Sequence, residues 1–191
     1  MENGEYFLWR SIQAIMKQSF KDYEIVIVQE GKMPVNSNAG LNKARGELIK
    51  ILYLDDYLAH VDSLQVIVDS FKKEDMWLAT GCIHQRYEPG NYEDPHSPHY
   101  PSYTNDIHLG NNRIGSPSVI TIRNKGHLLF DENLSFLLDC DLYRRYHDSY
   151  GPPKLVNDLN VIIGIHDGQT SNTMPQKEKL QEFEYVKNKY A

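Results

Sequence analysis

The chain of 191 residues has few cysteines, no apolar run long enough to cross a membrane and no excess of basic residues. Two cysteines, Cys82 and Cys140, are too few for a disulfide framework and favour the cytoplasm as the location. The N-terminal residues lack the basic segment and apolar core of a secretory signal. A formal net charge of -6 disfavours non-specific binding to nucleic acid, so we expect no nucleic-acid partner.

The composition fits one domain with a sizeable core, because 40% of the residues are hydrophobic and 24% are charged. Apolar periodicity predicts helices over residues 6–16, 38–45, 62–73, 135–147 and 176–190. It predicts strands over residues 24–28, 49–54, 77–83, 118–123 and 161–165, with Gly46 closing the second helix. Helices that alternate with strands indicate an α/β fold, with a mixed, mostly parallel sheet flanked by helices.

The most informative segment is the apolar run Ile49–Leu54, which ends in the adjacent acids Asp55 and Asp56. Ligands of open α/β sheets bind beyond the carboxyl ends of strands. Carboxylates at such a position suit a hard divalent cation that also holds phosphate oxygens. The alternative is structural: either acid could cap the helix that follows.

Residues 84–112 carry no periodic pattern and contain prolines at positions 89, 95, 98 and 101, so we expect a long loop without regular structure. Loops of this length in compact domains are usually functional or disordered. This one contains tyrosines at positions 87, 92, 100 and 103, whose amphipathic rings suit contact with sugars. We therefore interpret it as a lid over an acceptor.

Several motifs, in order, resemble a family 2 glycosyltransferase of the GT-A fold. Residues 11–28 are similar to the family's first helix and second strand. Residues 38–47 match its pattern Asn-x-Gly-x-x-x-Ala-x-Gly-Glu, and Leu54-Asp55-Asp56 falls on its metal motif. Residues 115–118, 138–142 and 166–171 resemble its donor-sugar, acidic catalytic and histidine segments. The resemblance covers residues 11–171, most of the chain.

The resemblance implies a metal-dependent, inverting transfer of a sugar. Asp56 and His166 are implied as ligands of Mn²⁺ or Mg²⁺, and Asp139 as the base that removes the acceptor's proton. Structural alternatives remain open, since His166 could be an ordinary strand-end histidine and Asp139 an ordinary helix acid.

The same resemblance implies a nucleotide-diphosphate sugar, with UDP as the expected nucleotide, and a saccharide or other hydroxyl acceptor. Glu30 is implied to contact the base, Asp55 the ribose or the metal's surroundings, and Gly115 and Ser116 the sugar.

The chain would then be a single GT-A domain with four parts. These are a nucleotide- and metal-binding half (residues 1–83), an acceptor-side loop (84–112), a donor-sugar and catalytic half (113–175) and a C-terminal helix (176–191).

Two departures from the family pattern support a second hypothesis. The usual first strand ending in Pro-Thr-x-Asn is not found, so we expect a domain that lacks this strand. The metal motif reads Tyr53-Leu54-Asp55-Asp56 instead of Asp-x-Asp-Asp. A non-catalytic relative, acting as a binding or scaffold module, is therefore the alternative. A phosphohydrolase has less support, because its aspartyl-phosphate type has Asp-x-Asp after the strand.

Overall fold

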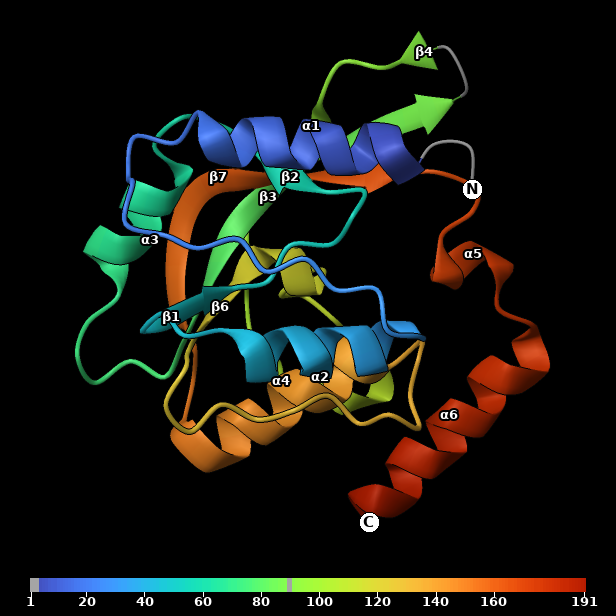
Figure 1. Cartoon of the computed structure of the whole chain (residues 1–191). Coiled ribbons are helices and arrows are strands. Elements are labelled where there is room, and N and C mark those ends of the chain that lie inside the picture. Colours follow the sequence, from blue (N-terminus) through green and yellow to red (C-terminus); the bar gives the residue numbers. More distant parts are fainter. Residues whose placement is uncertain (1–3, 89–90) are drawn as a thin grey trace.

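A curled sheet flanked by helices is the centre of the molecule (Figure 1), as a computed structural model describes it for residues 4–88 and 91–191. The helices are α1 (Gly4–Met16), α2 (Met33–Lys43), α3 (Ser63–Ser70), α4 (Leu138–Tyr150), α5 (Thr170–Thr173) and α6 (Gln176–Lys189). The strands are β1 (Leu48–Lys50), β2 (Tyr57–Leu58), β3 (Trp77–Glu88), β4 (Asn91–Tyr92), β5 (His96–His99), β6 (Ile120–Arg123) and β7 (Lys154–Ile165). Two 3-10 helices, η1 (Ile107–Leu109) and η2 (Pro117–Val119), lie in the connections.

The strand order in the sheet is β1-β6-β3-β7-β2, and β4 and β5 also pair with β3. Only β3 and β7 pair in parallel among the described residues, while the other five pairings are antiparallel. The prediction of a mostly parallel sheet is therefore wrong. Alternating helices and strands give parallel pairs only where a helix returns the chain to the neighbouring position, and here β6 enters between β1 and β3 in the opposite direction.

The predicted strand at residues 24–28 is also wrong, because this segment is irregular and joins no sheet. Ile25 and Ile27 are 41% and 58% exposed, so the β-branched run is not buried as its pattern suggested. A strand exists only where a neighbouring strand shares backbone hydrogen bonds with it, and no described strand pairs with this run. The run crosses the front of the molecule in Figure 1, between α1 and α2.

Helix α2 begins five residues before the predicted start and ends before the predicted cap. Pro34 occupies its first turn, where the missing N–H costs nothing. The C-cap is Ala44 in an extended conformation, so Gly46 is not the cap that we predicted.

The predicted loop 84–112 contains regular structure, which corrects our expectation. Strand β3 continues to Glu88, and β5 pairs with it across Cys82 and His99. Pro98 lies within β5, and an edge strand tolerates proline because one side of its backbone needs no partner. Pro89, which we also expected in this loop, lies outside the described residues.

The core fills the space between the sheet and α4. Trp77 of β3 stacks on Tyr143 of α4 with ring centroids 6.0 Å apart, and both side chains are almost completely buried. The indole N–H donates to the carbonyl oxygen of Gly151 at 3.0 Å, which ties the end of α4 to the sheet. Aromatic packing of this kind fixes α4, which carries a predicted site residue.

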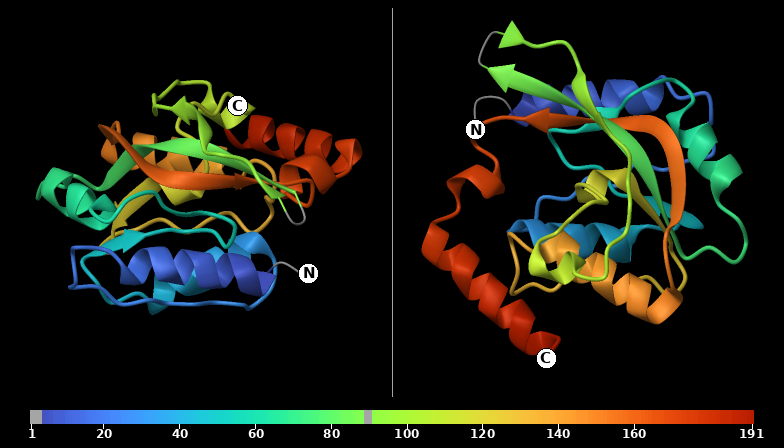
Figure 2. Two further views of the ribbon diagram at one scale, coloured as in Figure 1. Left: turned by 90° about the horizontal axis from the view of Figure 1, so that it is seen from above. Right: turned by 180° about the vertical axis from the view of Figure 1, so that it is seen from behind.

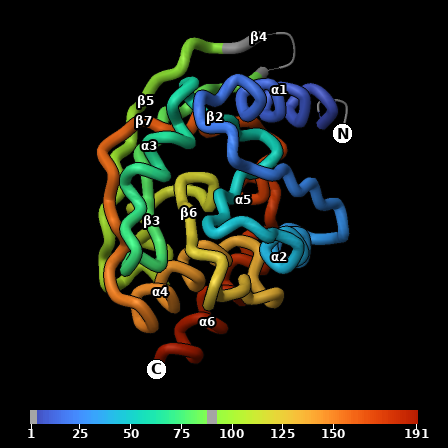
Figure 3. The backbone as a smooth tube through the Cα atoms, turned by 60° about the vertical axis from the view of Figure 1, so that its left-hand side comes forward, coloured from blue at the N-terminus to red at the C-terminus, as the bar shows by residue number. Residues whose placement is uncertain are grey.

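The predicted helices at both ends of the chain, α1 and α6, are confirmed. They lie on opposite sides of the molecule (Figures 2 and 3). Within the described part of the chain, none of the helices is long and apolar enough to span a membrane.

Candidate functional site

Asp55 and Asp56 lie in the turn that joins β1 to β2. The N–H of Asp56 donates to the carbonyl oxygen of Tyr53 at 3.0 Å, which closes the turn. The next helix, α3, has Asp62 at its N-cap, so neither acid caps a helix and that alternative is wrong.

The two carboxylates lie in different surroundings. Asp56 is 2% exposed, with one oxygen 3.0 Å from the N–H of Gly164 and the other 3.3 Å from the hydroxyl of Ser116. Asp55 remains partly accessible, and its Oδ2 lies 3.2 Å from Nε2 of His166. Asp56 therefore connects structural segments, whereas Asp55 and His166 form the accessible pair.

The turn is held close to β7 and α1. A Cβ atom on Gly164 would lie 2.3 Å from the carbonyl oxygen of Asp55, so only glycine allows β7 to approach the turn. Arg10 of α1 donates to the same carbonyl oxygen at 2.6 Å. Phe7 of α1 stacks on the ring of His166 at 5.7 Å. Segments far apart in the sequence thus fix both members of the accessible pair.

Lys50 is a half-buried lysine near Asp56. Its ammonium donates to the carbonyl oxygens of Ser118 and Ile120. Burial lowers the pKa of Lys50 to about 7, although the charge of Asp56 opposes this shift. Burial also raises the pKa of Asp56 to about 7, and the neighbouring charge of Asp55 adds to the shift. We did not assign Lys50 from the sequence, where the only signal was a lysine inside an apolar strand.

Asn112 connects the predicted donor-sugar segment to Asp139. Its side-chain amide donates to the carboxylate of Asp139 at 2.8 Å and to the carbonyl oxygen of Gly115 at 3.0 Å. The side-chain oxygen Oδ1 of Asn112 accepts the N–H groups of Ile114 and Gly115. Gly115 has φ +117°, a conformation that favours glycine. Asn112 was not among our predicted site residues, because nothing in a proline-rich segment marks one asparagine.

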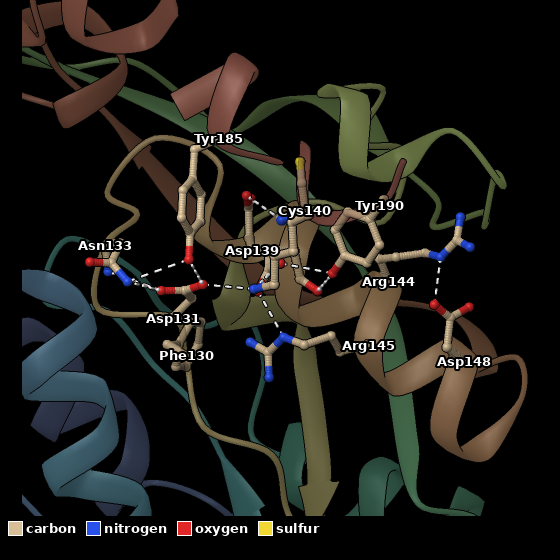
Figure 4. Close-up of polar contacts among 12 residues, drawn as sticks. Phe130, Asp131, Asn133, Asp139, Cys140, Arg144, Arg145, Asp148, Tyr185 and Tyr190 are labelled. Atoms are coloured by element: carbon tan, nitrogen blue, oxygen red, sulfur yellow. Dashed lines mark hydrogen bonds and ion pairs between the residues drawn. The ribbon is translucent and has the colours of Figure 1, made fainter. Parts of the chain in front are cut away.

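Asp139 lies in the first turn of α4 and is half-buried (Figure 4). One carboxylate oxygen accepts the N–H of Cys140 at 2.7 Å and the other accepts the amide of Asn112. Burial raises the pKa of Asp139, and these hydrogen bonds only partly offset the effect. A carboxyl in such a place accepts a proton more readily than a solvated one.

The charges of three predicted acids act on the hydroxyl of Tyr53. Burial raises the pKa of Tyr53, and the charges of Asp139, Asp56 and Asp55 raise it further, while a hydrogen bond with Ser37 opposes them. Tyr53 occupies the position of the first acid in the Asp-x-Asp-Asp pattern. The structure therefore places a phenol where that pattern has a carboxylate.

Hydrogen bonds join most of the predicted residues into one path. From Asp139, the path runs through Asn112 to Gly115, whose neighbour Ser116 bonds to Asp56. Asp56 bonds to Gly164, two residues before His166.

Glu30 lies outside that path. It lies before α2, its carboxylate pairs with Lys43, and its N–H donates to Asn36. A cavity of about 270 Å³ opens at Lys32, two residues after Glu30. It lies between the start of α2 and the segment after His166. Its lining residues are Lys32, Met33, Ser135, Thr170, Thr173, Met174 and Glu178.

The donor set for a cation is small. In the described part of the chain, no three His, Cys, Asp or Glu side chains converge on one point. Asp55 and His166 supply one carboxylate and one imidazole. These two groups could hold Mg²⁺ or Mn²⁺ only if phosphate and water supplied the other ligands of the ion. Such ions are commonly bound in this way in sites that bind phosphate.

No protein-family model matches the chain, and no curated protein sequence does. Among solved structures, the chain is similar to TarS of S. aureus, residues 1–349, with 16% identity and a TM-score of 0.57. This alignment covers 85% of the chain and 58% of that TarS structure. A second TarS structure aligns with 15% identity and a TM-score of 0.56. This alignment covers 96% of the chain and 37% of that TarS structure. The chain thus spans less than two thirds of each TarS structure, and it shares their fold.

Proposed function

We propose that the chain transfers a sugar from a nucleotide-diphosphate donor to a hydroxyl group, with inversion at the sugar carbon. The observation that supports this most directly is the pairing of Asp55 with His166 at 3.2 Å, 111 residues apart in the sequence. Asp139 is joined to the same region through Asn112 and Gly115. The fold shared with TarS agrees with the proposal.

The donor diphosphate lies against Asp55 and His166 in this proposal. These residues would hold Mn²⁺ or Mg²⁺, which would stabilise the negative charge of the leaving diphosphate. We predicted Asp56 as the metal ligand, but both of its oxygens have protein partners. In the proposal Asp56 fixes the turn that presents Asp55.

The sugar and the base of the donor contact the segments that we assigned to them from the sequence. Gly115 and Ser116 contact the sugar, and Glu30 contacts the base beside the cavity at the start of α2. UDP is the expected nucleotide.

Asp139 acts as the general base. An acceptor hydroxyl is a weak nucleophile, and a carboxylate within hydrogen-bond reach removes its proton as the new bond forms. The raised pKa of Asp139 suits this task, because a stronger base transfers the proton more readily. The acceptor, a saccharide or another hydroxyl compound, approaches from the side of residues 91–112.

The test is a transfer assay with a panel of UDP-sugars and Mn²⁺, read as release of nucleoside diphosphate. Asp139→Asn should lower kcat by about 10²- to 10⁴-fold, because the proton acceptor is lost. Asp148→Asn is the matched control, since Asp148 lies on the same helix and is 44% exposed.

The Asp139→Asn variant should still bind the donor. Equal rates in this variant and the wild type would contradict the role of Asp139. A wild type that binds nucleotides but releases no product would support the non-catalytic alternative, to which the tyrosine at position 53 already points.

A further inference from the structure

Helix α4 carries Asp139 but has no capping side chain of its own. Its N-cap residue, Leu137, makes no side-chain hydrogen bond to the helix. Glu182 of α6 instead binds the segment that leads into the helix: its carboxylate accepts the N–H groups of Ser135, Phe136 and Leu137 at 2.8, 2.8 and 2.9 Å. Glu182 therefore holds the three residues before α4 from a distant segment, and its negative charge near the helix N-terminus is favourable.

The last turn of α6 contacts α4 just after Asp139 in the sequence. Asp141 is fully buried, and its carboxylate accepts Lys189 and Tyr190 at 2.8 Å each. Lys189 also pairs with Asp131 at 2.7 Å, and Asp131 accepts the hydroxyl of Tyr185 at 2.9 Å. Figure 4 shows this cluster beside Asp139. Helix α6 thus contacts the chain immediately before and after Asp139.

Helix α6 also supports the segment that ends at Asn112, the amide partner of Asp139. The ring of Phe183 lies against Gly110, where an added Cβ would be 3.1 Å from Cε1 of Phe183. The rings of Tyr190 and His108 have centroids 5.0 Å apart. Both oxygens of Asp139 therefore bond to segments that α6 holds.

We propose that α6 is a positioning element for Asp139, and that Glu182 is the residue through which it fixes the first turn of α4. This inference rests on the proposed function, because it assigns α6 a role in that reaction. Glu182 does not contact the reacting groups in this proposal. It acts by setting where the base lies, and small displacements of a catalytic group can lower rates strongly.

The experiment compares wild type, Glu182→Gln and Glu184→Gln in the UDP-sugar assay with Mn²⁺. Glutamine keeps the shape of Glu182 but loses its charge and one acceptor oxygen. Glu184 is an exposed acid on the same helix and serves as the control. We expect Glu182→Gln to lower kcat about tenfold or more, with little change in the KM of the donor. Hydrogen exchange at the amides of residues 135–137 should become faster in this variant.

An unchanged kcat in Glu182→Gln would overturn the inference, and so would a fall in kcat matched by faster exchange throughout the protein. If Glu182→Gln does not fold, Lys189→Met tests the other contact: lower kcat at constant KM supports the inference and wild-type kcat overturns it. A wild type without transfer activity would instead refute the proposed function, so the two failures are distinguishable.

Discussion

At the scale of single residues, the adjacent acids Asp55 and Asp56 lie in one turn but make different contacts. Asp56 is buried against Gly164 and Ser116, while Asp55 is accessible and pairs with His166. Which of the two acids points inward depends on how close β7 comes, and this approach is set by Gly164, 108 residues from Asp56. The sequence therefore indicated an acidic turn but not the orientation of each acid.

The shifted pKa values of half-buried Lys50 and buried Asp56 predict how stability changes with pH. Between pH 3.8 and about 7, folded Asp56 keeps a proton that the unfolded chain has lost, so its contribution to stability falls as pH rises. Between about 7 and 10.5, folded Lys50 has lost a proton that the unfolded chain keeps, so its contribution rises with pH. Together, the two groups contribute least near pH 7.

Replacing Lys50 by methionine should remove the rise above neutral pH. We expect the free energy of unfolding, measured with urea at several pH values between 7 and 10, to increase with pH less in Lys50→Met than in wild type. Lys73→Met is the control, because Lys73 is exposed on the surface. The assignment fails if wild type and Lys50→Met have the same slope.

At the scale of helices and strands, elements whose signals are local were predicted well. Helices α1 and α6 follow their apolar periodicity, which needs no information about distant partners. The run 24–28 has strand propensity but no neighbouring strand, and β5 forms despite Pro98 because β3 offers it an edge. Strand pairing depends on the rest of the fold, and a single segment does not report it.

The contact between α6 and the segment before Asn112 gives a prediction at the same scale. Gly110 has φ +87°, and Phe183 lies where a side chain would project, so Gly110→Ala incurs both backbone strain and a steric clash. Phe183 belongs to α6, so this substitution tests how tightly α6 packs on the segment.

Gly110→Ala should lower the free energy of unfolding by about 1–3 kcal/mol, because overpacking against Phe183 adds to the backbone strain. In a Phe183→Leu background the same substitution should cost less, because the ring that the methyl group meets is gone. Urea unfolding of the four proteins measures the difference. Equal losses in the two backgrounds would show that Phe183 yields to a methyl group and that α6 does not pack tightly on this segment.

At the scale of the whole molecule, the curled sheet collects the candidate site from segments across most of the chain. The resemblance seen in the sequence pointed to a GT-A glycosyltransferase, and the structure shares the fold of TarS at 16% identity. Asn112 and Glu182 were beyond sequence reasoning. Each acts through a neighbour that is distant in the chain, and neither belongs to a recognisable pattern.

In the proposed reaction, Asp55 and His166 form a cation-dependent site for a nucleotide diphosphate. The most direct test of this site is calorimetric titration of wild type with UDP in Mn²⁺, in Mg²⁺ and in EDTA, repeated with Asp55→Ala. Asp69→Ala, which changes an exposed acid on α3, is the control. We predict binding that requires one of the cations and that weakens about tenfold or more in Asp55→Ala. The absence of binding to wild type with either cation, or equal binding by wild type and Asp55→Ala, would contradict the claim.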